Sequence, residues 1–191
     1  ECSLDQIKDI RLKTDIDLEV FIHGAMCVAV SGRCFTSQFL FDKSANRGEC
    51  IQPCRRSYTV KDKDEGFELE LDNNYVMSAK DLCTIKIIDK LIEAGIDSFK
   101  IEGRTKSSEY IKKVVSVYRH AMDSYRLGNL NMKLKSAMYE DLKKVYNRGF
   151  SQGFYLGKPG KDDFASQYGG IQKEVKIYAG KVKNFYKKSS R

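Results

Sequence analysis

The feature that most constrains this chain is a group of four cysteines, Cys27, Cys34, Cys50 and Cys54, spaced C-x6-C-x15-C-x3-C. From residue 24 to about residue 58 the sequence shows no long hydrophobic periodicity. An irregular segment of that length inside a domain requires a structural reason, and four thiolates bound to one metal centre would supply it. The spacing alone leaves zinc, an iron–sulfur cluster and four buried free cysteines open.

The composition is that of a folded protein. Its 191 residues are 41% hydrophobic with only two prolines, which predicts a domain with a core rather than a disordered segment. Six cysteines are too few for a disulfide scaffold, and their clustering favours a metal site in a cytoplasmic protein. No apolar stretch is long enough to span a membrane.

The net charge of +8 favours an anionic partner, of which nucleic acid is the commonest. An ordinary basic surface explains this charge equally well. The chain starts at Glu1 with neither a methionine nor a signal peptide and ends on a basic run, so we expect a piece of a longer protein. The sequence leaves the oligomeric state undetermined.

Hydrophobic periodicity and capping residues predict alternating helices and strands. The expected elements are a helix over 3–13, a strand over 18–23, a hairpin at 66–75, a helix over 78–92 capped by Ser78, a strand over 96–101, a helix from 107 or 108 to 127, and a helix over 136–146. Cys83 would then lie at a helix start as a small buried hydrophobic residue.

Helix, strand and helix joined by short connections indicate a parallel α/β architecture. We therefore expect a partial α/β domain over residues 1–150 with a cysteine-rich insertion at 24–58. A linker would follow over 151–170, and 171–191 would form the first strand of a second, β-type domain.

Two strand ends carry polar side chains. In a parallel barrel, functional residues lie at the carboxyl ends of the strands, which makes His23, Lys100, Glu102 and Arg104 candidate catalytic residues. By alternation Lys100 and Glu102 share a strand face, so an inward-facing ion pair is expected, either for proton transfer or as a structural salt bridge. Arg104 would bind a carboxylate or phosphate, and Glu19 would share the face of His23.

Several blocks of the sequence resemble the collagenase-like peptidase family of unassigned catalytic type, peptidase family U. The cysteine segments are the most specific of these blocks, and the likeness spans nearly the whole chain. The blocks are 19–27 (EVFIHGAMC), 31–34 (SGRC), 48–55 (GECIQPCR), 77–83 (MSAKDLC), 94–104 (AGIDSFKIEGR) and 148–154 (RGFSQGF).

The resemblance implies the carboxy-terminal half of a TIM-barrel-like domain, followed by the start of a small β-barrel domain. It also implies oxygen-independent hydroxylation of a tRNA wobble uridine, of a cytidine in 23S rRNA or of a ubiquinone precursor. In such members four cysteines hold a 4Fe–4S cluster, and prephenate is linked to the RNA reactions. By position, the ligands in this chain would be Cys27, Cys34, Cys50 and Cys54.

Three functions follow from these observations. The first is an iron–sulfur enzyme that hydroxylates RNA. The second is a peptidase, although the sequence has neither an H-E-x-x-H zinc motif nor a G-x-S-x-G nucleophile elbow. The third is an RNA-binding module without catalytic activity, in which the metal only holds the long loop.

Overall fold

A four-stranded sheet forms the centre of the computed structural model, which describes residues 1–30, 32–69, 73–171, 180–181 and 183–184. Its strands run in the order β5 (Ser98–Ile101), β1 (Glu19–Gly24), β4 (Asp81–Cys83) and β6 (Phe150–Ser151). β1 is parallel to β5 and antiparallel to β4, and β4 is parallel to β6. The predicted α/β class is confirmed, but the sheet is mixed rather than wholly parallel.

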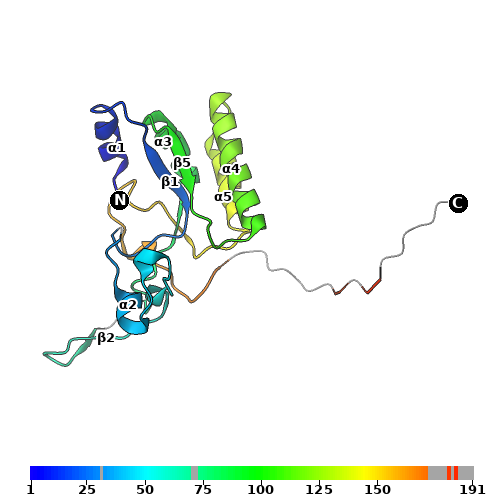
Figure 1. Cartoon of the computed structure of the whole chain (residues 1–191). Coiled ribbons are helices and arrows are strands. Elements are labelled where there is room, and N and C mark those ends of the chain that lie inside the picture. The colour runs from blue at the N-terminus through cyan, green and yellow to red at the C-terminus, as the bar shows by residue number, and fades with distance from the viewer. Residues whose placement is uncertain (31, 70–72, 172–179, 182, 185–191) are drawn as a thin grey trace.

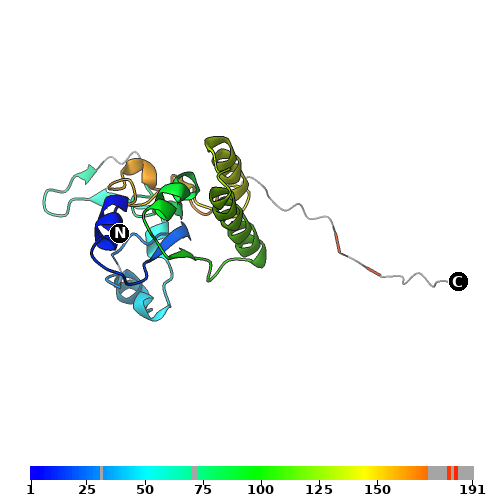
Figure 2. The same ribbon diagram turned by 90° about the horizontal axis from the view of Figure 1, so that it is seen from above.

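Four α-helices pack around this sheet: α1 (Leu4–Arg11), α3 (Ile88–Glu93), α4 (Ser108–Arg126) and α5 (Met132–Leu142). α4 and α5 lie together on one side of the sheet and α1 lies on the other (Figures 1 and 2). Three of these helices begin at a polar side chain that accepts a hydrogen bond from a backbone N–H three residues later. These capping residues are Ser3, Ser107 and Asn131.

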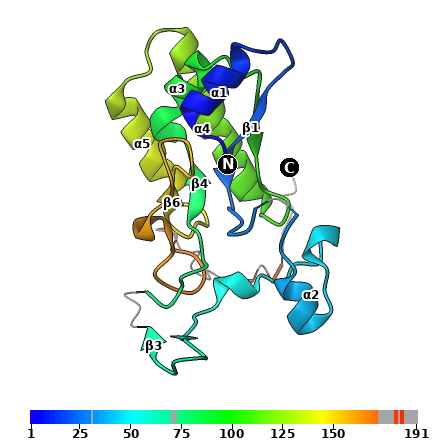
Figure 3. The ribbon, with the colours of Figure 1, turned by 90° about the vertical axis from the view of Figure 1, so that its left-hand side faces the viewer.

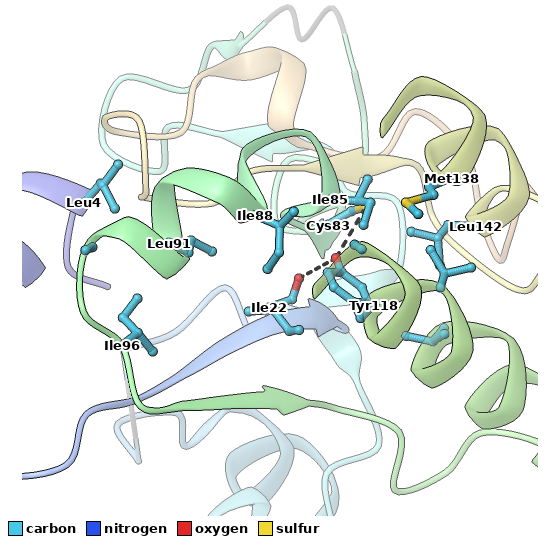
Figure 4. Packing of buried hydrophobic residues seen from close by; sticks show 14 of the residues in the cluster. Leu4, Ile22, Cys83, Ile85, Ile88, Leu91, Ile96, Tyr118, Met138 and Leu142 are labelled. Carbon is cyan, nitrogen blue, oxygen red and sulfur yellow. Dashed lines mark hydrogen bonds between the residues drawn. The ribbon is translucent and has the colours of Figure 1, made fainter. Parts of the chain in front are cut away.

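The hydrophobic core lies between β1, α3, α4 and α5 (Figure 4). Tyr118 of α4 is its largest fully buried side chain, and the Tyr118 hydroxyl donates a hydrogen bond to the Ile22 carbonyl at 2.9 Å. The same hydroxyl accepts one from the Thr84 N–H at 3.0 Å. Because Ile22 lies in β1 and Thr84 directly follows β4, this side chain fixes α4 against both strands.

The sequence predicted most of these elements but misplaced the starts of two helices. Residues 78–83 form a short connection and strand β4 rather than the start of a helix, so the capping box expected at Ser78 was wrong. Asp81 and Leu82 pair with β6, and Leu82 and Cys83 pair with β1; this pairing overrides the local helix signal. Helix α5 begins at Met132, four residues before the expected position, because Asn131 caps it.

The cysteine-rich segment holds only short elements, as its lack of periodicity predicted. These are α2 (Thr36–Phe41) and single 3₁₀ turns at Ala45–Arg47 and Pro53–Arg55. A small hairpin follows, in which β2 (Val60–Lys61) pairs with β3 (Glu68–Leu69), slightly upstream of the hairpin predicted at 66–75. In Figure 3 this whole segment lies at one end of the sheet, away from α3, α4 and α5.

Residues 150–165 fold back beside β4. A 3₁₀ turn at Lys161–Asp163 and a bridge between Ala79 and Phe164 hold this return, and Ala165 is buried. The strand expected over 171–191 lies almost wholly outside the described residues. Within the described part of the chain, no helix combines the length and apolar character needed to cross a membrane.

Candidate metal centre

The carboxyl ends of β1 and β5 lie at the same end of the sheet because these strands are parallel. There the Glu102 N–H donates to the His23 carbonyl at 2.8 Å. Gly24 has φ +123°, and a Cβ at this position would lie 2.5 Å from the Glu102 carbonyl oxygen. Only glycine allows so close an approach, so Gly24 directs the chain out of β1 and into the cysteine-rich segment.

All four predicted ligand cysteines line one cavity of about 840 Å³ at this end of the sheet. Its other walls are largely apolar and include Phe21, Val28 and Phe154. Each of the four cysteines is a free thiol, exposed or half-buried. The structure thus brings together residues that are 27 positions apart in the sequence, from Cys27 to Cys54. Cys2 also lines this cavity, which sequence reasoning did not anticipate.

Hydrogen-bond donors already point at one of these sulfurs. The Gln52 N–H lies 3.4 Å from Cys50 Sγ, and the Ser37 hydroxyl lies 3.8 Å from the same atom. Burial raises the pKa of the Cys54 thiol; neighbouring Arg55 lowers it, and Cys27, Cys50 and Cys34 raise it. Across the described residues, no three His, Cys, Asp or Glu side chains converge on one point as the ligands of a single ion would.

Arg55 connects this segment to the sheet. Its guanidinium donates to the Met26 carbonyl at 2.5 Å, to the Ser78 hydroxyl at 3.1 Å and to the Ala79 carbonyl. Met26 precedes the first cysteine of the group, and Arg55 itself follows the last one. One planar cation therefore links both ends of the cysteine group to the residues before β4.

A second arginine binds the same region. Arg148 donates through its backbone N–H and its guanidinium to both carboxylate oxygens of Asp81, at 3.2 Å each. The Asp81 side chain is 2% exposed and that of Arg148 is 11% exposed, so this ion pair is buried. The guanidinium also reaches the Gln52 side-chain oxygen at 3.4 Å.

Sequence reasoning missed this pair as a site. Asp81 and Arg148 lie in two of the blocks that carry the family resemblance, but nothing in their spacing shows that the two blocks meet. Pairing of β4 with β6 brings them together.

The predicted ion pair between Lys100 and Glu102 is wrong. Lys100 Nζ instead lies 2.8 Å from Glu19 on the neighbouring strand, and both side chains are 51% exposed. The Glu102 carboxylate accepts a hydrogen bond from the backbone N–H of Arg104 at 3.1 Å. Arg104 itself is exposed. An exposed pair of this kind contributes little to stability.

His23 faces the core. A register shift between Phe21 and His23 breaks the alternation of β1, so Glu19 and His23 do not share a face as predicted. The imidazole is 1% exposed and packs against the rings of Tyr110, Tyr118 and Phe150, with Nδ1 3.4 Å from the Tyr118 hydroxyl. Burial lowers the pKa of His23 to about 3, so the ring is neutral at physiological pH.

Comparison with known proteins identifies sequences that are similar to this chain. The profile described as Peptidase family U32 matches residues 1–165. A collagenase of Porphyromonas gingivalis is 46% identical over 87% of this chain and 40% of its own length. A tRNA hydroxylation protein of Bacillus subtilis is 42% identical over 85% of this chain and 40% of its own.

A 23S rRNA 5-hydroxycytidine synthase of Escherichia coli is 45% identical over 84% of this chain and 25% of its own length. The chain thus spans less than half the length of each of these relatives. No solved structure matches the chain significantly.

The buried neutral His23 predicts a pH dependence of stability. Between pH 6.5 and about 3 the unfolded chain binds a proton at this residue that the folded chain does not bind. The free energy of unfolding therefore falls as the pH falls through this window, by up to about 1.4 kcal/mol per pH unit. Urea denaturation from pH 7 to pH 3.5 should show a shallower decline for His23→Gln than for the wild type.

His120→Gln is the matched control, since His120 lies exposed on α4 and its replacement should leave the decline unchanged. Equal slopes for wild type and His23→Gln would show that residue 23 is protonated in the folded protein as readily as in the unfolded chain.

Proposed function

Because this chain belongs to peptidase family U32, we propose that it is the cysteine-bearing part of an enzyme that binds an iron–sulfur cluster and hydroxylates RNA. The observation that carries this proposal is the single cavity lined by Cys27, Cys34, Cys50 and Cys54. These four thiols would be the cluster ligands. The names of the tRNA and rRNA hydroxylation relatives support an RNA substrate.

The surroundings of the four thiols suit a cluster of several irons better than one zinc ion. Four sulfurs around a single zinc lie about 3.8 Å apart, as Zn–S bonds of about 2.3 Å in a tetrahedron require. Here the four cysteines line a cavity of about 840 Å³ without any three possible ligands among the described residues lying as close as one ion requires, and a larger inorganic centre separates its ligands further. The N–H and O–H groups directed at Cys50 are donors of the kind that tune cluster potentials.

When bound, the cluster would supply one-electron chemistry. The chain's own residues hold its ligands in place. Arg55 fixes the backbone beside Cys27 and Cys54, and its positive charge offsets that of the thiolates. Phe21, Val28 and Phe154 give the cavity apolar walls beside the four thiols.

The net charge of +8 is consistent with tRNA or rRNA as the partner. Prephenate is our proposed co-substrate, on the family resemblance alone. The relatives named for tRNA and rRNA hydroxylation are bacterial, and RNA of bacteria is cytoplasmic, so we propose a cytoplasmic location.

Proteolysis is the alternative that the collagenase name raises. A Cys–His nucleophile would require His23 to accept a proton from Cys27. The His23 Nδ1 faces the Tyr118 hydroxyl, and the ring is buried among aromatic side chains. A cysteine that binds a metal is also not free to attack a peptide bond.

Replacing any one of the four ligand cysteines with alanine should remove the cluster. Anaerobically purified wild-type protein is expected to be brown with bound iron and sulfide, and Cys50→Ala should lose both because an incomplete ligand set does not retain the centre. Iron and acid-labile sulfide per chain are the quantities to measure. Colourless protein with stoichiometric zinc would instead favour the metal-stapled RNA-binding module.

Two cysteines serve as controls. Cys83 is buried on β4 with its thiol pKa raised to about 11 by burial, so Cys83→Ala should keep its iron and cost about 1 kcal/mol of stability. Cys2 lines the same cavity but lies outside the resemblance blocks, so Cys2→Ala should also keep its iron. Loss of iron in Cys83→Ala but not in Cys50→Ala would overturn the ligand assignment.

The hydroxylation itself is tested in cells. Mass spectrometry of nucleosides from tRNA and rRNA of a gene-deletion strain should show the loss of one hydroxylated pyrimidine, restored by the wild-type gene but not by a Cys50→Ala gene. The peptidase proposal predicts unchanged nucleosides together with cleavage of gelatin by the purified protein.

A further inference from the structure

Lys106 and Arg148 lie near the cysteine-rich segment, and neither has a role in holding the proposed metal ligands. Lys106, two residues beyond the block at 94–104, places its ammonium 4.0 Å from the ring centroid of Tyr146 and 5.4 Å from that of Tyr110. The Arg148 guanidinium lies 5.2 Å from the same Tyr146 centroid. The two cations are therefore within about 9 Å of each other.

The charges in this cluster do not balance. The charged groups that act on Lys106 are Asp81, Glu102, Arg148 and Arg55. Together with Lys106 itself, the cluster holds three positive side chains and two negative ones. Asp81 is taken up by Arg148, and Glu102 accepts from the Arg104 backbone. Among the described residues, the Lys106 ammonium has no carboxylate or hydrogen-bond acceptor as a partner and contacts only the two tyrosine rings, although the residue is half-buried.

A half-buried ammonium that lies beside two arginines and has no carboxylate partner lowers the stability of the fold unless an anion binds next to it. Burial lowers the pKa of Lys106, and Arg148 lowers it further, which is the direction expected for a cation in surplus. A carboxylate or phosphate that accepts hydrogen bonds of about 2.8 Å through two of its oxygens bridges donors up to about 8 Å apart. The upper limit of about 9 Å between the Lys106 ammonium and the Arg148 guanidinium is close to this span.

We infer that Lys106 and Arg148, packed on Tyr146, form a binding site for an oxyanion, a carboxylate or phosphate, of the substrate. The position supports this role: Arg148 also contacts Gln52, whose N–H is directed at Cys50 Sγ. An anion held here would lie beside the segment that carries the proposed metal ligands. Arg104, which the sequence suggested for this task, is exposed and takes no part in the cluster. The inference goes beyond the proposed function and does not depend on a bound cluster.

The test is the affinity for malonate, a small dicarboxylate, measured by isothermal titration calorimetry with the purified protein. Lys106→Met keeps the stem length but removes the charge, so the dissociation constant for malonate should rise at least tenfold. Lys106→Arg keeps the charge and should bind malonate within about threefold of wild type. Lys112→Met, at an exposed position in the first turns of α4, is the control and should bind malonate as tightly as wild type.

A purely structural lysine would behave differently. Removing it should lower the thermal midpoint, whereas removing a surplus charge from a ligand site should leave the midpoint unchanged or raise it. The oxyanion can come from a small acid or from the RNA backbone, and a second titration distinguishes these sources.

For an RNA phosphate, Lys106→Met should reduce the slope of log affinity for a single-stranded RNA against log salt by about 0.7. For a small acid, that slope stays unchanged while malonate affinity falls. If Lys106→Met changes neither malonate affinity nor the salt slope, the site does not exist. Each of these titrations can be run on protein without iron, so its failure is separate from failure of the cluster proposal.

Discussion

The guanidinium of Arg55 makes the contacts on which the site depends. It binds the Met26 carbonyl on one side and the Ser78 hydroxyl and Ala79 carbonyl on the other, while its own backbone continues from Cys54. Without these bonds, the cysteine-rich segment would be joined to the sheet mainly through the chain at Gly24 and through Arg148. The segment has only short helical turns of its own. The conformation of this segment therefore depends on its contacts with one end of the sheet. At that end the parallel strands β1 and β5 approach each other closely at Gly24.

Two chemically distinct regions meet at this end of the sheet. The cavity of the four cysteines is lined by thiols and apolar side chains. The cluster of Arg55, Arg148 and Lys106 is cationic and includes the ring of Tyr146. Gln52 contacts both, through its N–H to Cys50 and its side chain to Arg148. The proposed iron–sulfur centre beside the proposed oxyanion site would suit an enzyme that must hold an anionic substrate next to an electron carrier. Neither region requires the exposed Lys100–Glu19 pair.

The sequence predicted local features better than long-range ones. Ser3, Ser107 and the apolar stripe of α4 determine helices through contacts a few residues apart, and these were predicted correctly. Ser78 carried an equally good local helix signal, but pairing of residues 81–83 with β1 and β6 prevailed. The four cysteines could be grouped by type and clustering. Asp81, Lys106 and Arg148 could not, because only strand pairing brings such distant residues together, and the bulge in β1 that turns His23 into the core has no sequence signal.

The claim that four sulfurs share one inorganic centre is tested most directly by Mössbauer spectroscopy of the protein reconstituted anaerobically with iron-57 and sulfide. We expect four irons per chain, with a spectrum typical of a single 4Fe–4S cluster that disappears in a variant lacking one of the four thiols. Protein that retains no iron, or iron with the spectrum of an isolated ion, would contradict it.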